Sequence, residues 1–307
     1  MFDVIGFGAL NLDKVYLVNR IAGSGEESFI TGYNESCGGS AANTVTALAK
    51  LGLSTGYVGK VADDREGHLL LKDFRENLVD VRGIAVAGKG RSGVVMAFVD
   101  PEGERALYVD PGVNDTLTRG DVDVGYASST KLIHLTSFVG DEPLKAQIEL
   151  LEGLGDRIIV SLDPGEIYAR RKEAIRPLLE RTEILLLNEV ETRILTGLGF
   201  EHGAEKLLNL GPKMVVVKLG SRGCYAMDGV QSLHVGAFKT RVVDTTGAGD
   251  AFNAGFIYGT LKGLSLEARL KLACFTASKC IGEVGARRGL PSKEEVEAIL
   301  REQRGGG

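Results

Sequence analysis

Short apolar segments alternate with amphipathic segments along the chain from Ala127 onward. Four of the apolar segments are rich in Ile, Val and Leu without polar alternation, as expected of parallel strands that are covered on both faces: Lys131–Leu135, Arg157–Leu162, Glu183–Leu187 and Lys213–Lys218. The amphipathic segments between them predict helices over Glu142–Leu154, Ala169–Glu180 and Glu189–Thr196. This alternation of strands and helices predicts an α/β domain built on a doubly wound, mostly parallel sheet.

The first 115 residues have a different pattern, with short segments in which apolar and polar residues partly alternate. These segments predict four strands, at Val15–Asn19, Ser28–Tyr33, Val94–Val99 and Arg105–Val109. Pro101–Glu104 predicts a hairpin turn between the last two strands. We therefore expect a small, discontinuous, antiparallel β-sheet lid formed by residues 12–36 and 88–112, beside a main domain formed by residues 1–11, 37–87 and 113–303.

Five helices and one further strand complete the predicted main domain. The strand is Gly56–Lys60, and the helices are Ala41–Leu51, Arg65–Leu78, Ala248–Gly263, Leu266–Val284 and Lys293–Gln303. Residues 304–307 are expected to form a disordered tail, because chain ends without packing partners are commonly unstructured.

Composition and charge exclude several classes of function. The 42 glycines among 307 residues are about twice the usual share of roughly 7%, which indicates tight turns and backbone that something approaches closely. The net charge is −5 with Lys and Arg spread throughout, so no nucleic-acid partner is expected. Because no apolar run approaches the ~20 residues of a membrane span and the N-terminus lacks a basic region, we expect neither a membrane anchor nor a signal peptide. The four cysteines have no CxxC spacing, which argues against a zinc or thioredoxin site. As free thiols they indicate the cytoplasm.

Two glycine-containing segments resemble nucleotide-binding motifs only in part. Gly6–Asn11 begins like a dinucleotide fingerprint, but Asn11 stands where the third glycine is required and no helix follows. Gly83–Lys89 has the spacing of a P-loop, but Gly90 stands where Ser or Thr must reach Mg²⁺. NAD-dependent oxidoreduction and P-loop hydrolysis are therefore both disfavoured.

The segment Val243–Phe256, VDTTGAGDAFNAGF, carries the most specific chemistry in the chain. Thr245 and Thr246 are suited to capping a helix. Gly247–Gly249 is a run of small residues whose N–H groups can converge on an anion at the helix N-terminus. Asp250 falls in the first turn, where a carboxylate is either a partner of the helix dipole or a base aimed at the anion's reaction partner. Spacing alone leaves both readings of Asp250 open.

This segment closely resembles the C-terminal signature of the ribokinase-like (PfkB) carbohydrate kinases, and Cys37–Gly52 resembles their N-terminal signature. The resemblance covers nearly the whole chain and implies a three-layer α/β/α domain with a β lid. It implies that Asp250 deprotonates the acceptor hydroxyl, while the backbone of Gly247, Ala248 and Gly249 forms an anion hole for the transferred phosphoryl group. The acceptor-binding residues that it implies are Asn11, Asp13, Gly38, Gly39 and Asn43. Without the family, Asn11 and Asp13 are open to an Asx turn, and the two glycines to a turn before a buried helix.

The same resemblance implies a nucleotide and metal site. Asn188–Glu191 matches the family's NxxE motif, in which Glu191 orders Mg²⁺ through water, although the spacing also predicts a helix-capping box. The nucleotide-binding residues that the resemblance implies are Asn188, Lys218, Gly220, Gly223, Thr246 and Gly249. Gly282–Gly289 resembles the loop over the adenine and the monovalent-cation site, whose ligands would map to Asp244, Thr246 and carbonyls near Cys280, Glu283 and Gly285. Gly289 replaces the hydroxyl residue of ribokinase proper, so the sequence leaves a monovalent cation open.

The sequence therefore predicts a cytoplasmic kinase that transfers the γ-phosphoryl group of ATP, with Mg²⁺, to a hydroxyl of a sugar or nucleoside, and that forms a homodimer through the lid. The alternatives are a sugar-phosphate kinase, which in some relatives uses ADP, and a non-catalytic sugar-binding regulatory protein, which would have no need of Asp250 as a base. Ser40 stands where relatives that act on phosphosugars commonly carry Lys, whereas Arg91 or Arg105 on the lid is available to a phosphorylated acceptor. His134 lies in an apolar strand and is expected to be a core residue.

Overall fold

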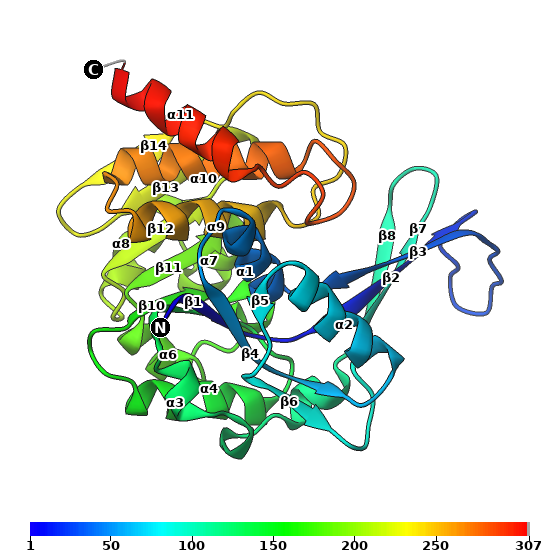
Figure 1. The fold of residues 1–307 in the computed structure, drawn as a ribbon. Helices are drawn as coiled ribbons and strands as arrows, with labels where there is room; N and C mark the ends of the chain where they lie inside the picture. The colour runs from blue at the N-terminus through cyan, green and yellow to red at the C-terminus, as the bar shows by residue number, and fades with distance from the viewer. Residues whose placement is uncertain (306–307) are drawn as a thin grey trace.

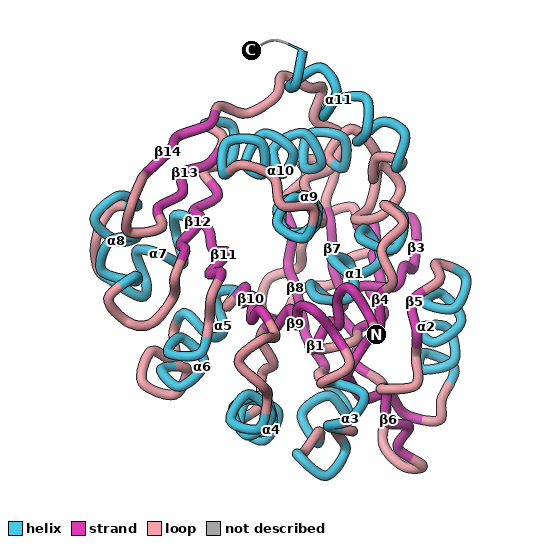
Figure 2. The backbone as a smooth tube through the Cα atoms, turned by 60° about the vertical axis from the view of Figure 1, so that its left-hand side comes forward, coloured by secondary structure: helices cyan, strands magenta, loops and turns pink. Residues whose placement is uncertain are grey.

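The computed structural model describes residues 1–305, and the side chains of residues 1–301. One large sheet runs through the described chain in the order β14-β13-β12-β11-β10-β9-β1-β4-β5, with β6 paired to β4 (Figures 1 and 2). Its strands are β1 Phe2–Phe7, β4 Thr55–Ala62, β5 Val79–Asp80, β6 Ile84–Ala87, β9 Thr130–Thr136, β10 Ile159–Asp163, β11 Ile184–Asn188, β12 Met214–Lys218, β13 Cys224–Met227 and β14 Ser232–Val235. All strand pairs are parallel except those that β13 makes with its two neighbours. The predicted fold class, a mostly parallel α/β sheet with a second small β-sheet, is confirmed.

Helices cover both faces of this sheet because successive residues of each buried strand point to opposite sides. Ile184 and Leu186 belong to the apolar cluster on one face, whereas Leu185 and Leu187 belong to the cluster on the other. The first face is covered by α1 Ser40–Lys50, α2 Arg65–Glu76, α9 Ala248–Leu261 and α10 Leu266–Cys280, with α11 Lys293–Gly305 outside α10. The second carries α3 Val124–Ala127, α4 Asp141–Gly153, α5 Gly165–Ala169, α6 Arg176–Arg181, α7 Glu189–Thr196 and α8 Phe200–Leu208. Three 3₁₀ turns are also described: Gly112–Thr116, Arg119–Asp121 and Gly220–Arg222.

Helix α9 is the central element of the first face. Its residues from Ala251 to Gly259 are all buried, and it packs between α1 and α10 (Figure 2). The close packing depends on Gly255, where a Cβ would lie 2.6 Å from the hydroxyl of Thr276 on α10. A helix enclosed in this way holds its N-terminal turn in one position relative to the sheet.

A separate four-stranded sheet projects from the main body (Figure 1). Its order is β3-β2-β7-β8, with β2 Asn11–Val18, β3 Ile30–Gly38, β7 Gly93–Val99 and β8 Arg105–Asp110. We call this sheet the lid. Asn11 on β2 is in register with Gly38 on β3 and Gly93 on β7. These three lid strands therefore join the main domain at the same level.

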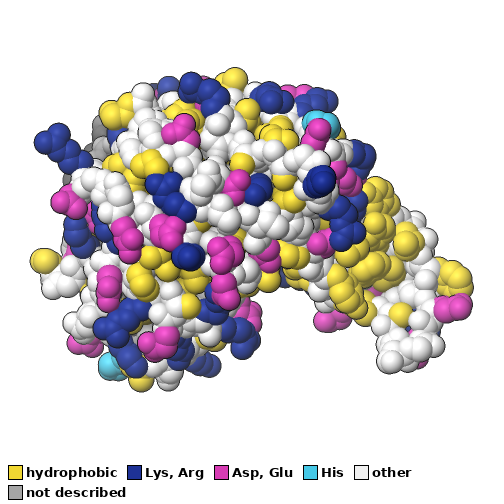
Figure 3. All heavy atoms as spheres, turned by 90° about the horizontal axis from the view of Figure 1, so that it is seen from below, with side chains coloured by type: hydrophobic (Ala, Val, Ile, Leu, Met, Phe, Trp, Pro, Cys, Tyr) yellow, Lys and Arg dark blue, Asp and Glu magenta, His cyan; other side chains and the backbone are white. Residues whose placement is uncertain are grey.

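Both faces of the lid carry apolar side chains. By alternation, Val15, Leu107 and Val109 share the face of Asp13, while an aromatic cluster lies on the other face. This cluster consists of Tyr16, Tyr33, Phe98 and Tyr108, with neighbouring ring centroids 5.1–5.8 Å apart. In the view from below, hydrophobic side chains gather on the part of the projection nearest the main body, whereas its outer part is mostly white (Figure 3). Phe29 is exposed, as expected, whereas Val15 and Val95 are half-buried.

The structure corrects several details of the sequence interpretation. The lid is mixed rather than antiparallel, because β2 and β7 both leave the main domain in the same direction and pair in parallel. Of the helix predicted over Ala169–Glu180, only the last part forms, as α6 from Arg176, while α5 ends at Ala169 where the prediction begins. Pro177 stands in the first turn of α6, where its missing N–H is tolerated. The short antiparallel edge strands β13 and β14 were not predicted.

At the C-terminus, α11 continues to Gly305, through two residues of the predicted disordered tail. The remaining two residues, 306–307, lie outside the part of the chain that the structure describes. Within residues 1–305, every helix is too short or too polar to cross a bilayer.

The central place of α9 leads to a prediction about stability. Phe256 is completely buried in this helix, so Phe256→Ala should lower the free energy of unfolding by about 3–5 kcal/mol through lost burial and the cavity left behind. Chemical denaturation would measure this change. Val230→Ala is the control, since Val230 is 93% exposed and its loss should change the free energy of unfolding by less than about 0.5 kcal/mol.

Candidate active site

The chain enters α9 through a sharp turn that only glycine can make. Gly247 has a φ of 76°, in the left-handed region, and a Cβ there would lie 2.4 Å from the Cβ of Ala286. The first backbone N–H groups of the helix have no intrahelical acceptor, and Gly249 has no side chain to cover them. Because Ala248 and Gly249 line a cavity, the positive end of the helix dipole faces that cavity.

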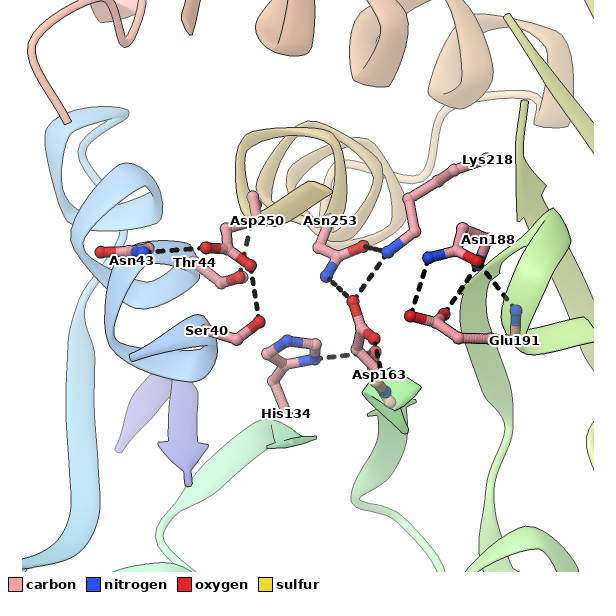
Figure 4. Close-up of polar contacts among 12 residues, drawn as sticks. Ser40, Asn43, Thr44, His134, Asp163, Asn188, Glu191, Lys218, Asp250 and Asn253 are labelled. Carbon is pink, nitrogen blue, oxygen red and sulfur yellow. Dashed lines mark hydrogen bonds and ion pairs between the residues drawn. The ribbon is translucent and has the colours of Figure 1, made fainter. Parts of the chain in front are cut away.

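Asp250 lies in the first turn of α9 and points toward α1 (Figure 4). Its carboxylate accepts hydrogen bonds from Ser40 Oγ at 2.5 Å and from Asn43 Nδ2 at 2.8 Å. Burial raises the pKa of Asp250 to about 6, although the hydrogen bonds from Ser40 and Asn43 oppose this rise. The carboxylate is therefore an unusually basic group that is nevertheless ionised at neutral pH.

The predicted acceptor residues gather on the α1 side of Asp250. Asp13 on β2 packs against Gly38 so closely that a Cβ on Gly38 would lie 2.1 Å from the Asp13 carboxylate. Burial raises the pKa of Asp13 to about 6, with the charge of Arg287 lowering it and that of Asp250 raising it. Gly39 has a φ of 107°, and a Cβ there would meet the carbonyl of Ala9 at 2.3 Å.

Asn43 and Asn11 complete this predicted group in different ways. Asn43 on α1 is buried and directly contacts Asp250. Asn11 lies at the beginning of β2, and its Oδ1 accepts a hydrogen bond from Asn114 Nδ2 at 3.1 Å. Asn11 thus fixes the junction between the lid and the main domain.

On the other side of Asp250, Lys218 is held by two polar partners (Figure 4). Its Nζ lies 2.7 Å from Asp163 Oδ2 and 3.3 Å from Asn253 Oδ1. Burial lowers the pKa of Lys218, but the carboxylates of Asp163 and Glu191 more than offset this, so its pKa lies above the ordinary value. The ammonium group lies 3.5 Å from where a Cβ of Gly249 would stand, so a fixed positive charge flanks the start of α9.

The Asn188–Glu191 pair forms the capping box that its spacing predicts. Asn188 Oδ1 accepts from the N–H of Glu191 at 2.9 Å, and Glu191 Oε2 accepts from the N–H of Asn188 at 2.8 Å. Burial, followed by the charge of Asp163, raises the pKa of Glu191 to about 7. Among the side chains of residues 1–301, no three His, Cys, Asp or Glu converge as a metal-binding cluster.

A cavity of about 820 Å³ extends from Asp250 along the ends of β10, β11 and β12. Of the predicted nucleotide residues, Asn188, Lys218, Gly220, Gly223 and Gly249 line it, as does Glu191. Gly223 has a φ of 89°, and a Cβ there would lie 1.9 Å from the carbonyl of Val235. Thr246 does not line the cavity, since its hydroxyl is turned to Asp244 Oδ1 at 2.7 Å. The other oxygen of Asp244 accepts from the N–H of Gly285 at 2.8 Å.

The structure also adds site residues that the sequence interpretation missed. Asn253 donates to Asp163 Oδ2 at 2.7 Å. It follows Asp250 by three residues and therefore shares its helix face, a spacing that was visible in the sequence. Arg287 reaches Asn43 from the C-terminal loop, and no local pattern marks this contact. His134 is a fully buried core residue, as expected, and burial lowers its pKa to about 4.

Comparison with known proteins identifies the class. The structure matches the ribokinase of Thermotoga maritima with a TM-score of 0.88 at 27% identity, covering 98% of this chain and 100% of the other. It matches an Arabidopsis thaliana ribokinase complexed with ribose and ATP with a TM-score of 0.86 at 25% identity, over 98% and 99% of the two chains. The pfkB family carbohydrate kinase model matches residues 1–293, and this chain belongs to that family. It is a phosphotransferase that acts on a hydroxyl group.

Two relatives are similar over most of their length. An uncharacterized sugar kinase of Archaeoglobus fulgidus is 45% identical over 248 residues, which cover 80% of this chain and 98% of that protein. An ATP-dependent ribose-1-phosphate kinase of Halopiger xanaduensis is 31% identical over 303 residues, which cover 99% of each protein.

The raised pKa of Asp250 predicts a pH-dependent change in stability. An acid whose pKa is higher in the folded state stabilises the fold below its unfolded pKa, and this contribution is lost as the pH rises through about 6. Asp250→Asn should therefore raise the free energy of unfolding at pH 8 by an amount on the order of 2 kcal/mol, and the melting temperature with it. At pH 5 both increases should be smaller. Calorimetry at both pH values would measure the difference. Asp228→Asn is the control, because backbone hydrogen bonds, chiefly from Gln231, lower the pKa of Asp228 and no gain is expected.

Proposed function

We propose that this protein transfers the γ-phosphoryl group of ATP to a sugar hydroxyl, with Asp250 as the general base. The observation that carries the proposal is the place of Asp250 between two regions. On one side lie the first turn of α9, Lys218 and the cavity. On the other side lie Asn43 and Asp13. An acceptor held by Asp13 and Asn43 would present its hydroxyl to Asp250 while the triphosphate approaches from the cavity.

The chemical step then needs one proton transfer and one phosphoryl transfer. The acceptor oxygen bonds to the γ-phosphorus as its proton passes to Asp250, and the bond from the γ-phosphorus to the bridging oxygen breaks so that ADP leaves with the electron pair. The backbone N–H groups of Gly247, Ala248 and Gly249 would stabilise the charge on the transferred group, as preorganised donors do in phosphoryl transfer. Closure of the lid would exclude water, which would otherwise compete with the sugar.

The residues around Glu191 fit a magnesium ion held mainly by water and phosphate. Mg²⁺ commonly keeps several waters and takes one or two carboxylates together with substrate phosphates. Glu191 lines the cavity and supplies such a carboxylate, which would hold the ion's water. When bound, the ion would supply positive charge that neutralises the phosphates.

A phosphorylated sugar is the second candidate acceptor. The specific observation is the 31% identity, over 99% of both proteins, to an ATP-dependent ribose-1-phosphate kinase. Of the two lid arginines considered for a phosphate, Arg91 forms an exposed ion pair with Asp110 at 2.9 Å. A coupled ADP-release assay with ribose, nucleosides and ribose 1-phosphate would separate the two candidates.

Replacement of the base is the direct test of the mechanism. Asp250→Asn keeps the shape of the side chain and removes its basicity, so kcat should fall by about 10²–10⁴-fold while ATP binding persists. Steady-state kinetics and calorimetric ATP binding would measure the two effects. Wild-type turnover by Asp250→Asn on an authentic acceptor would refute the proposed mechanism.

Asp13 should control affinity for the acceptor. Asp13→Ala removes a charged acceptor of hydrogen bonds from sugar hydroxyls, a loss of roughly 1.5–3 kcal/mol, so KM for the sugar should rise about 10-fold or more. The KM for ATP serves as the internal control and should change little. An equal rise in both KM values would indicate that Asp13 is structural.

The apolar lid is proposed to form a homodimer, because a projecting sheet with hydrophobic side chains on both faces is unfavourable in water. Leu107, Tyr108 and Val109 of the edge strand β8 are each more than half exposed, at 53%, 59% and 51%. Sedimentation velocity at micromolar concentration should show a dimer, and Leu107→Asp should dissociate it, whereas Val230→Asp should not. A monomeric wild-type protein would contradict this assembly.

A further inference from the structure

Arg287 connects four segments that are distant in the sequence. It lies in the loop between α10 and α11, and its side chain is only 13% exposed. Its Nε donates to Asn43 Oδ1 at 2.8 Å, and its Nη1 forms an ion pair with Asp73 on α2. Since Asn43 Nδ2 donates to Asp250 Oδ2, a continuous chain of hydrogen bonds runs from Asp73 through Arg287 and Asn43 to the base.

The chemistry of this chain leaves only one orientation for the Asn43 amide. A guanidinium group can donate hydrogen bonds and cannot accept them. The atom of Asn43 that faces Arg287 must therefore be the oxygen, and the atom that faces Asp250 must be the NH₂ group. Arg287 and Asp250 both favour this orientation, so without Arg287 only the hydrogen bond to Asp250 would hold the amide, and the side chain would be less firmly oriented.

Arg287 is also held firmly by its own loop. The carbonyl of Arg287 accepts a hydrogen bond from Lys50 Nζ at 2.8 Å. The preceding Ala286 packs against Gly247, where a Cβ would come within 2.4 Å. The loop that carries Arg287 is thus seated on the turn that begins α9.

The burial of Arg287 is not explained by stability alone. Its third nitrogen, Nη2, is buried without a hydrogen-bond partner among the described residues. An incompletely paired guanidinium in a protein interior costs free energy, and such departures from good packing are concentrated at functional sites.

We propose that Arg287 is a positioning residue, which orients the Asn43 amide so that it donates to the carboxylate of Asp250. This inference rests on the proposed role of Asp250 as the base. It predicts that the effect of Arg287 on kcat depends on Asn43, whereas its charge also acts on the acceptor ligand Asp13. A residue that bound the acceptor directly would instead act independently of Asn43.

The state of Asp250 also depends on other charges around it. Five ionisable groups interact electrostatically with Asp250: Asp13 on β2, Tyr57 on β4, Asp163 on β10, Lys218 on β12 and Cys280 on α10. Arg287 lies beyond Asn43. A hydrogen bond from Asn43 lowers the pKa of Asp250, so losing the orientation of that bond should move the pKa upward.

A double-mutant cycle tests the proposal. Arg287→Met removes the guanidinium and keeps the aliphatic stem, and it should lower kcat roughly 10-fold to 100-fold, the worth of one charge-assisted hydrogen bond, with little change in KM for ATP. In an Asn43→Ala background, the same substitution should have almost no further effect. The matched control is Arg75→Met, since Arg75 is exposed on α2 and should leave kcat unchanged. Additive losses, or a rise confined to the acceptor KM, would overturn the proposal.

A second measurement does not depend on turnover. The pKa of Asp250 can be followed by the carboxyl ¹³C chemical shift in aspartate-labelled protein, with Asp250→Asn to assign the signal. Arg287→Met should raise this pKa, and added guanidinium ion, by binding in the space left by the side chain, should partly restore it in Arg287→Ala. An unchanged pKa would overturn the role of Arg287. Wild-type turnover by Asp250→Asn would instead refute the proposed base. The titration of Asp250 would still decide whether Arg287 orients Asn43, because it does not depend on turnover.

Discussion

The whole site depends on holding one carboxylate, Asp250, deep in the cleft at the first turn of an enclosed helix. Burial makes the group more basic, and the hydrogen bonds from Ser40 and Asn43 keep its charged form accessible. These opposing effects are possible only because α9 is fixed on all sides, with α1 supplying the donors. A mobile helix would let the carboxylate reach water, and its pKa would return to the ordinary value.

The parallel sheet explains why the remaining polar groups meet at the same place. Asp163, Asn188 and Lys218 are the last residues of three neighbouring strands, β10, β11 and β12. The carboxyl ends of parallel strands lie on one edge, which is where open α/β sheets bind ligands. Asp163 and Lys218 neutralise one another there, and Asn253 satisfies the carboxylate further. The cluster is therefore stable before any anion arrives, and Lys218 still lies beside the start of α9.

The lid has a different physical basis from the main domain. Its strands are held by backbone pairing and by side chains that remain partly in water, whereas the main sheet is covered by helices on both faces. Asp13 belongs to the lid, yet its carboxylate packs against Gly38 at the point where the lid meets α1. Movement of the lid would thus carry one proposed acceptor ligand relative to Asp250, which belongs to the rigid part.

By itself, the sequence determined the features that depend on neighbouring residues. The continuous apolar segments predicted the buried strands, Gly247 marked the beginning of α9, and the Asn188–Glu191 spacing predicted the capping box, because each signal acts within one or two turns of chain. The tertiary structure alone decided the parallel pairing of β2 with β7, the packing of Ala286 against Gly247 and the contact of Arg287 with Asn43. These features join residues from 39 to 244 positions apart, and the interactions that create them exist only after the core has brought those segments together.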